Sequence, residues 1–151
     1  MAEFTLYTDG GCHGNPGPGG WAYLIEYDSK TIENNGGEAE TTNNRMELTA
    51  VIRGLEQIRE TSQSITGTAR IKVYTDSQYV KNGITTWIKN WLRNGWKTSA
   101  KKPVKNRDLW MKLHELSNQF EVEWKWLRGH SGYEGNERCD ALVQDAIARF
   151  E

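Results

Sequence analysis

The tripeptide Tyr-Thr-Asp occurs twice in this chain, at residues 7–9 and 74–76, and each copy ends a short run that is typical of a β-strand. A small or polar residue follows each Asp, so a turn can begin there. An Asp in that position can point into a cleft at the edge of a sheet, and two on neighbouring strands would lie close together. Like charges so close repel, and one pKa rises unless a cation holds both groups. The repeat therefore predicts that Asp9 and Asp76 belong to a divalent-metal site.

The rest of the chain alternates strand patterns with helix patterns. We expect strands at 3–8, 20–27, 31–41, 70–76 and 120–127, helices at 44–60, 77–82, 85–94, 107–119 and 136–150, and long loops at 10–20, 61–69, 95–106 and 128–135. Ser77 can cap the helix that follows it, and alternate apolar residues of 120–127 share one face. The apolar stripe of the last helix comprises Cys139, Leu142, Val143, Ala146, Ile147 and Phe150. Tight connections make the first three strands antiparallel, and helical crossovers make the last two parallel to the first. The sequence thus predicts an α/β fold, with helices on both faces of a mixed five-stranded sheet whose central first strand lies beside the fourth.

The length of 151 residues favours one domain spanning 1–151. The first residues lack the basic and apolar regions of a signal peptide, and no apolar run approaches the length of a membrane span. Cys12 and Cys139 lack metal-site spacing, so we expect free thiols in a reducing compartment. These features predict a cytoplasmic protein without a membrane partner, and a monomer is the default because no apolar stripe is left for an interface.

Charge is distributed unevenly along the chain. Residues 86–107 carry seven basic side chains and no acidic one, so the remainder carries −8 in a chain whose net charge is −1. One basic patch on an otherwise acidic domain indicates a specific electrostatic surface rather than a general means of solubility.

Two further acids and one histidine are candidates for chemistry. Glu47 follows the spacing of the buried face of its helix, where a charge is costly unless it is paired or bound to metal. Both Glu47 and Asp140 also lie near expected helix N-termini, where an acid can simply favour the helix dipole. His130 lies in a glycine-flanked loop that suits a proton carrier near neutral pH, although an ordinary surface histidine would look the same. We expect His114 on a helix surface and leave His13 open.

Several motifs occur in a fixed order along the chain. The main ones are Tyr-Thr-Asp-Gly-Gly at 7–11, Thr-Asn-Asn-Arg-Met-Glu-Leu at 42–48, Thr-Asp-Ser-Gln-Tyr-Val at 75–80, Gly-His-Ser-Gly at 129–132 and Asn-Glu-Arg-Cys-Asp at 136–140. The runs at 14–21, 95–98 and 101–106 fit the same pattern. One motif alone is weak, but the ordered set covers nearly the whole chain and resembles bacterial type 1 ribonuclease H.

The resemblance implies a ribonuclease H-like fold and an endonuclease that hydrolyses the RNA strand of RNA/DNA hybrids, leaving 5′-phosphate and 3′-hydroxyl ends. It implies that four carboxylates bind metal and act in catalysis with a mobile proton-transfer histidine: Asp9, Glu47, Asp76, Asp140 and His130. Two Mg²⁺ ions are implied, with Mn²⁺ as a substitute, and hard oxygen ligands are what these ions prefer. The implied chemistry is a two-metal in-line displacement at an RNA phosphate.

The resemblance also implies residues that hold the hybrid. Amides that can read 2′-hydroxyl groups and base edges in the minor groove are Asn15, Asn43, Asn44 and Gln78. Thr42 and Arg45 match the part of the family that holds a phosphate of the DNA strand. The segment at about 86–107 matches a basic substrate-binding protrusion, whose candidate contacts are Trp87, Lys89, Trp91, Arg93, Trp96, Lys97, Lys101, Lys102 and Lys105. Among these, we expect Trp87 to contact sugars of the DNA strand. We expect Trp91 or Trp96 to form the small core of the protrusion.

Three other kinds of protein share parts of this pattern. The run at 14–20 is rich in glycine, but it lacks the spacing of a dinucleotide-binding turn and no Gly-Lys-Ser/Thr follows. An integrase-like nuclease would share the sheet and the acids, and a silent hybrid-binding module would share the surface. The loop at 61–69 is longer than the compact bacterial form suggests, and the residues after His130 depart from the commoner family wording.

Overall fold

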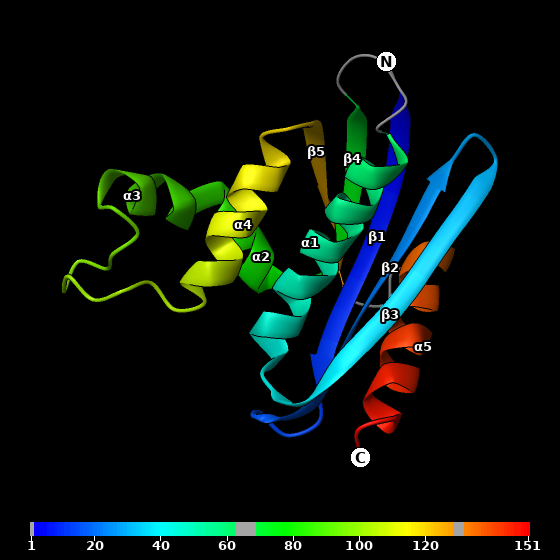
Figure 1. Ribbon diagram of the computed structural model, residues 1–151, viewed down its shortest axis with the longest axis horizontal. Coiled ribbons are helices and arrows are strands. Elements are labelled where there is room, and N and C mark those ends of the chain that lie inside the picture. Colours follow the sequence, from blue (N-terminus) through cyan, green and yellow to red (C-terminus); the bar gives the residue numbers. More distant parts are fainter. Residues whose placement is uncertain (1, 63–68, 129–131) are drawn as a thin grey trace.

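The computed structural model describes residues 2–62, 69–128 and 132–151, and its strands form one sheet in the order β3-β2-β1-β4-β5 (Figure 1). The strands are β1 (Glu3–Cys12), β2 (Gly17–Tyr27), β3 (Lys30–Thr41), β4 (Arg70–Thr75) and β5 (Glu121–Trp126). The helical segments are α1 (Asn43–Thr61), α2 (Gln78–Asn82), the π-helical turn η1 (Gly83–Trp87), α3 (Ile88–Arg93), α4 (Arg107–Ser117) and α5 (Glu134–Ala148).

The strand directions confirm the mixed sheet that the sequence predicts. β2 is antiparallel to β1 and β3, whereas β4 is parallel to both β1 and β5. The parallel register pairs Tyr7 with Tyr74, and the two rings stack with centroids 4.9 Å apart. The two copies of the tripeptide therefore run in step on adjacent strands, which brings Asp9 and Asp76 to the same end of the sheet.

Helices cover both faces of the sheet, also as predicted (Figure 1). Alternate residues of β2 point to opposite sides, Tyr23 and Ile25 into the larger core under α1 and Ala22 and Leu24 into the smaller one under α5. α1 packs against β1, β2 and α4, whereas α5 packs against β1, β2 and β3. Each fully buried aliphatic side chain stabilises the fold by about 1.5–3 kcal/mol, so apolar burial fixes both helices against the strand that carries Asp9.

Two side-chain caps fix where helices begin beside the site. Thr42 Oγ1 accepts a hydrogen bond from the Arg45 backbone N–H (3.3 Å) at the start of α1. Ser77 Oγ accepts from the Val80 N–H (3.1 Å) at the start of α2, as the sequence predicted. A cap of this kind is worth about 1 kcal/mol, and here both caps also set the chain direction directly beside a candidate catalytic acid.

The predicted long turn at 10–20 is wrong in extent. β1 continues to Cys12 and β2 begins at Gly17, with Cys12 opposite Gly19. Glycines suggest turns in a sequence, but here they continue the ladder because helices approach it closely. A Cβ on Gly20 would lie 2.9 Å from both the Cβ of Ala146 and the carbonyl oxygen of Val143 on α5.

The last helix also differs from its predicted bounds of 136–150. It begins at Glu134 and ends at Ala148. Phe150, expected in its apolar stripe, lies beyond the helix and is 41% exposed. The remaining stripe residues are buried as predicted: Cys139, Leu142, Val143, Ala146 and Ile147.

The structure describes both cysteines and the apolar character of the helices. Cys12 and Cys139 are free thiols, as predicted. Among the described residues, no helix combines the length and the apolar character needed to cross a membrane.

Candidate active site

Four carboxylates converge on Asp9, which lies within β1 rather than at its predicted end: Asp9 itself, Glu47 on α1, Asp76 directly after β4 and Asp140 on α5. Asp9 lies on β1, and the parallel register places Asp76, directly after β4, beside it. The negative charge of Asp76 acts on both Asp9 and Glu47, and that of Asp140 acts on Asp9. All four residues are only partly exposed, so the cluster is a recessed acidic site.

Glu47 reaches this cluster because α1 lies directly on the β1 backbone at Gly10. A Cβ built on Gly10 would lie 2.4 Å from the carbonyl carbon of Met46 and 2.5 Å from the backbone nitrogen of Glu47. Only a glycine permits that approach. The absence of a side chain at Gly10 therefore sets the distance between the strand of Asp9 and the helix of Glu47.

Asp140 arrives from the opposite face on α5. The Cys139 thiol donates to the Tyr7 carbonyl oxygen (3.4 Å), which ties this part of α5 to β1 two residues before Asp9. The charge of Asp140 acts on Asp9 and raises the pKa of its carboxyl group. The two cores of the fold thus bring one acid each to the same strand.

Burial and mutual repulsion raise the pKa values within the cluster. Burial is the larger cause for Asp9, followed by the charges of Asp76 and Asp140, and the pKa rises from 3.8 to about 7. Burial, then Asp76 and Asp9, raise the pKa of Glu47 from 4.5 to about 8, against a hydrogen bond from Asn43. Repulsion within the cluster disfavours the ionised carboxylates, and a bound cation would offset that repulsion.

The donors fit a hard divalent cation, because they are carboxylate oxygens without a thiolate or imidazole among them. Within the part of the chain that the structure describes, however, no group of three or more acidic, histidine or cysteine side chains stands in a metal-holding geometry. The Asn43 side-chain amide donates to Glu47 instead. The oxygen donors and their convergence from separate elements fit a hard divalent cation, which Asp9, Glu47, Asp76 and Asp140 would hold.

The raised pKa values predict how the stability of the metal-free protein depends on pH. Between about pH 4 and 8 the unfolded chain releases protons that Asp9 and Glu47 retain when folded, so the free energy of unfolding falls as pH rises. We expect the Tm in EDTA to fall across this range, and 10 mM Mg²⁺ to raise Tm more at pH 8 than at pH 5.5. Thermal unfolding of the chain and of Asp9→Asn checks this. Equal effects of Mg²⁺ at both pH values would contradict it.

Amide side chains lie next to the acids. The Asn43 backbone N–H donates to the side-chain oxygen of Asn15 (3.0 Å), which links the turn after β1 to the start of α1. Asn15 itself is exposed, and Asn44 is partly exposed on the first turn of α1. Gln78 is exposed at the first position of α2, two residues after Asp76. The amide side chains predicted to contact the hybrid therefore lie on elements next to the acidic cluster. Their contact with substrate stays a prediction.

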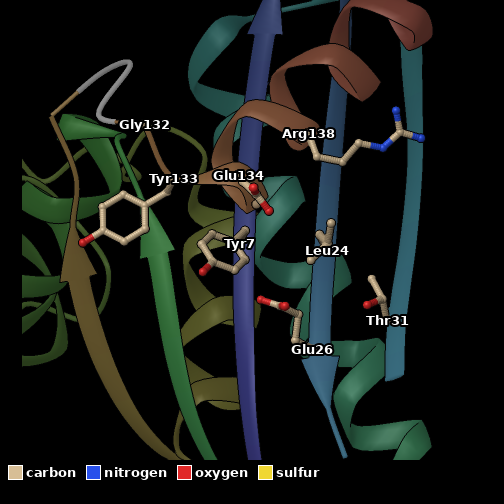
Figure 2. Close-up of a pocket in the computed structure, with 9 residues that line it drawn as sticks. Tyr7, Leu24, Glu26, Thr31, Gly132, Tyr133, Glu134 and Arg138 are labelled. Carbon is tan, nitrogen blue, oxygen red and sulfur yellow. The ribbon is translucent and has the colours of Figure 1, made fainter. Parts of the chain in front are cut away.

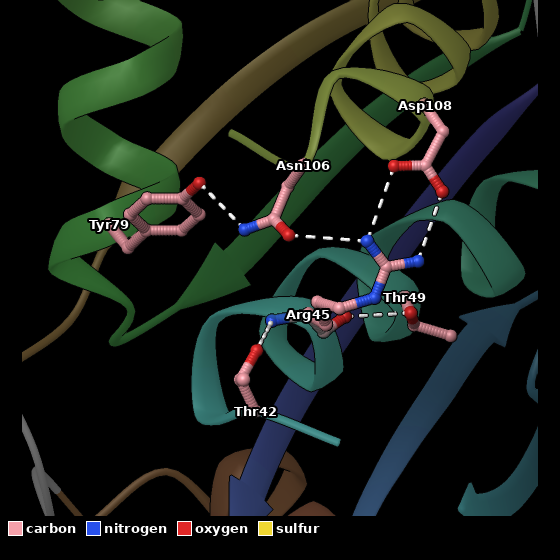
Figure 3. Close-up of polar contacts among 6 residues, drawn as sticks. All are labelled: Thr42, Arg45, Thr49, Tyr79, Asn106 and Asp108. Atoms are coloured by element: carbon pink, nitrogen blue, oxygen red, sulfur yellow. Dashed lines mark hydrogen bonds and ion pairs between the residues drawn. The ribbon is translucent and has the colours of Figure 1, made fainter. Parts of the chain in front are cut away.

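Arg45 is held in a polar network at the junction between α1 and α4 (Figure 3). Its Nη1 donates to Asn106 Oδ1 (3.2 Å) and Asp108 Oδ1 (3.2 Å), and its Nη2 donates to Asp108 Oδ2 (3.0 Å). Asn106 Nδ2 donates in turn to the Tyr79 hydroxyl (3.0 Å). The Arg45 guanidinium lowers the pKa of the Asp108 carboxyl, chiefly through these hydrogen bonds. The sequence indicated Arg45 but not its partners, which are 61 and 63 residues away along the chain.

The basic segment projects from the body beside α4 (Figure 1). Its six cations named above are exposed on α3 and the following loop: Lys89, Arg93, Lys97, Lys101, Lys102 and Lys105. The tryptophans instead face one another. Trp91 lies at the centre of the group, with ring centroids 5.9 Å from Trp87, 6.0 Å from Trp96 and 5.5 Å from Trp110.

Trp91 packs against three other tryptophan rings but stays partly exposed, so its role in the core of the protrusion and its contact with substrate stay predictions. Trp87 also contacts Tyr79, with centroids 5.6 Å apart, yet stays partly exposed and available for the predicted DNA contact. The packed tryptophan rings thus form the base from which the exposed cations project.

A separate hollow of about 550 Å³ lies on the α5 side of the sheet (Figure 2). The Tyr7 and Tyr133 rings and the carboxylates of Glu26 and Glu134 line it, whereas none of the four clustered acids does. Arg138 also lines the hollow, which is therefore a separate site of mixed charge.

Three histidines were considered from the sequence. His130 lies outside the described residues, so its predicted role as proton carrier stays a prediction. His114 is not simply a surface residue, because its ring lies edge-on to Trp96 with centroids 6.1 Å apart and it is partly buried. His13 is exposed and contacts Glu151 and Gln144.

Known proteins share both the sequence and the fold. A family model described as RNase H matches residues 1–148. Ribonuclease H of Hydrogenovibrio crunogenus is 52% identical over 147 residues, covering 97% of this chain and 97% of that protein. The crystal structure of LC9-RNase H1, a type 1 RNase H with the type 2 active-site motif, has a TM-score of 0.84 at 31% identity and covers 100% of this chain and 74% of that one.

A second solved structure, LC11-RNase H1 in complex with an RNA/DNA hybrid, has a TM-score of 0.69 at 24% identity and covers 97% of both chains. At that identity the likeness supports the fold alone. The similarities extend over the elements that carry the four acids and the basic segment.

Proposed function

The chain belongs to the ribonuclease H family, and on that premise we propose that its four clustered carboxylates bind the divalent cations with which it hydrolyses the RNA strand of RNA/DNA hybrids. The observation that carries this assignment is the convergence of Glu47, Asp76 and Asp140 on Asp9, with raised pKa values for Asp9 and Glu47. Mg²⁺ is the expected cofactor and Mn²⁺ a substitute, because both take oxygen ligands.

Bound at these carboxylates, two such ions supply activation of the attacking water and stabilisation of the leaving 3′-oxygen. The side chains of the protein would orient the carboxylates and transfer the proton. Asp9 lies where the charges of Asp76 and Asp140 both act on it, so it would be a central ligand of the cluster. The Asn43 amide keeps the Glu47 carboxylate oriented from within α1. His130 is assigned to proton transfer. Attack of water on the phosphorus with breakage of the P–O3′ bond would leave 5′-phosphate and 3′-hydroxyl ends.

Recognition of the hybrid is assigned to two surfaces around the acids. Asn15, Asn43, Asn44 and Gln78 offer amides that donate to and accept from 2′-hydroxyl groups and base edges. On the other side, Thr42 and Arg45 face the DNA strand, and the exposed cations of the protrusion neutralise phosphates. A single RNA strand would leave the DNA-facing surface unused, which favours the hybrid over RNA alone.

The direct test is a gel assay with 5′-labelled RNA as a single strand, as an RNA duplex and as an RNA/DNA hybrid, each with Mg²⁺ or EDTA. Cleavage of the hybrid alone, and only with metal, is the expected result. Cleavage of DNA or of every RNA form would assign the chain to another nuclease chemistry on the same fold. Tight hybrid binding without cleavage would indicate a silent binding module.

Neutralising the exposed loop lysines is expected to weaken substrate binding without stopping the chemistry. In the variant Lys101→Gln, Lys102→Gln and Lys105→Gln, we expect KM to rise about tenfold or more while kcat changes less than about twofold, because each lost phosphate contact weakens binding. The salt dependence of KM should become shallower. The matched control changes Lys30, Lys72 and Lys112 to Gln, all exposed and outside the protrusion. An unchanged KM in the first variant would show that this loop does not hold the hybrid.

A further inference from the structure

The polar network around Arg45 uses one part of the guanidinium and leaves another. The end of the group, Nη1 and Nη2, forms the two-pronged contact with Asp108, and the second Nη1 hydrogen is donated to Asn106. A guanidinium carries five N–H donors in a fixed plane. No hydrogen bond among the described residues uses the remaining two, the Nε–H and the second Nη2–H, which point in parallel from one edge. That edge matches two oxygens of a phosphate.

The partners of Arg45 also fix where this edge points. Asp108 lies in the first turn of α4, directly after the basic segment ends. Asn106 adopts a left-handed backbone conformation (φ 60°) and is held by the hydroxyl of Tyr79, which also accepts from Trp110 Nε1 (2.9 Å). Trp110 is fully buried. The network therefore joins a flexible arginine on the catalytic helix to the rigid base of the protrusion.

We propose that Asp108 is a positioning residue for substrate binding: it holds the Arg45 guanidinium so that its Nε–Nη2 edge is free to receive a phosphate. The inference rests on the proposed function, because the phosphate belongs to the hybrid. Asp108 itself is an acid, and it touches the substrate only through Arg45.

This role makes a prediction opposite in sign to simple electrostatics. Removing a negative charge beside a polyanion site should tighten binding if charge alone matters. If Asp108 positions Arg45, Asp108→Asn should instead raise KM for hybrid cleavage about fivefold while kcat stays within about twofold, because an unfixed guanidinium must be ordered at each binding event. Asp108→Glu, which keeps a carboxylate for the fork, should recover part of the loss.

A double-mutant cycle tests the coupling to Arg45. In an Arg45→Lys background, which keeps the charge but lacks the planar fork, Asp108→Asn should change KM by less than about twofold. Asp145→Asn, at an exposed acid on α5, is the matched control and should leave KM unchanged. The Tm of each variant separates folding from binding, since the Arg45–Asp108 pair is largely exposed and contributes little stability.

The outcomes divide clearly. A KM that falls or stays constant in Asp108→Asn would overturn the proposal, and so would an equal rise in both backgrounds. If the unmodified chain cleaves no hybrid at all, the proposed function fails first. Equilibrium binding of a hybrid labelled on its DNA strand then still tests whether Asp108→Asn weakens the contact.

Discussion

Replacing Asp9 with Asn is expected to lower kcat for hybrid cleavage by about a thousandfold or more, a loss of about 4 kcal/mol in transition-state stabilisation. Asp9 is the acid on which the charges of both Asp76, after β4, and Asp140, on α5, act, so its carboxylate would be a ligand that the cations could least do without. Hybrid affinity should stay within about threefold, because the recognition surfaces lie on either side of the cluster. Steady-state cleavage and fluorescence anisotropy of a labelled hybrid measure the two quantities.

The folded state of this variant provides an internal check. Since Asp9 carries a raised pKa through burial and repulsion, Asp9→Asn should unfold in EDTA at the same Tm or higher at pH 8. Asp145→Asn serves as the control for removal of an acid from the surface of α5. Loss of hybrid binding in step with activity, together with a lower Tm, would show that Asp9 holds the structure rather than the cations.

Replacing Gly10 with Ala is expected to destabilise the fold and lower activity together. The added Cβ would lie 2.4 Å from the Met46 carbonyl carbon and 2.5 Å from the Glu47 backbone nitrogen, and backbone atoms cannot turn away as a side chain can. Overpacking of this kind costs about 1–3 kcal/mol or more. Because α1 must move away from β1, Glu47 leaves the cluster, and we expect kcat to fall by about a hundredfold. Urea unfolding and steady-state cleavage measure both effects.

The adjacent glycine provides a matched control. A Cβ on Gly11 would meet only Val143 Cγ1 at 3.5 Å and Ile147 Cδ1 at 3.9 Å, which are ordinary contacts with side chains. Gly11→Ala should therefore keep most of the stability and activity. If both alanine variants behave alike, the close approach of α1 at Gly10 is not what places Glu47.

Much of the fold was predictable because periodic patterns are local. The alternation of β5, the helical stripe of α5 and the cap at Ser77 are each properties of a few consecutive residues, and the structure confirms them. Patterns failed where glycines serve packing rather than turning: β1 runs on to Cys12 because its glycines accommodate two helices. The predicted helix ran to residue 150, but α5 ends at Ala148. A stripe of apolar residues does not show where the sheet that the helix packs against comes to an end.

The candidate site divides in the same way. Asp9 and Asp76 were predictable from the sequence because parallel strands with the same tripeptide bring the same position to the same edge. Glu47 and Asp140 drew attention as acids on apolar helix faces, but their approach to Asp9 depends on Gly10 and on the contact of Cys139 with Tyr7. The sequence by itself determined which residue types could do the chemistry.

Only the tertiary structure decided which groups hold one another. Arg45 and Asp108 are 63 residues apart and share no periodic signal, so their two-pronged contact exists only because α1 packs beside α4. The free edge of the guanidinium follows from that contact alone. Local chemistry is encoded residue by residue, whereas the direction in which a long side chain points is set by distant elements that meet when the core is buried.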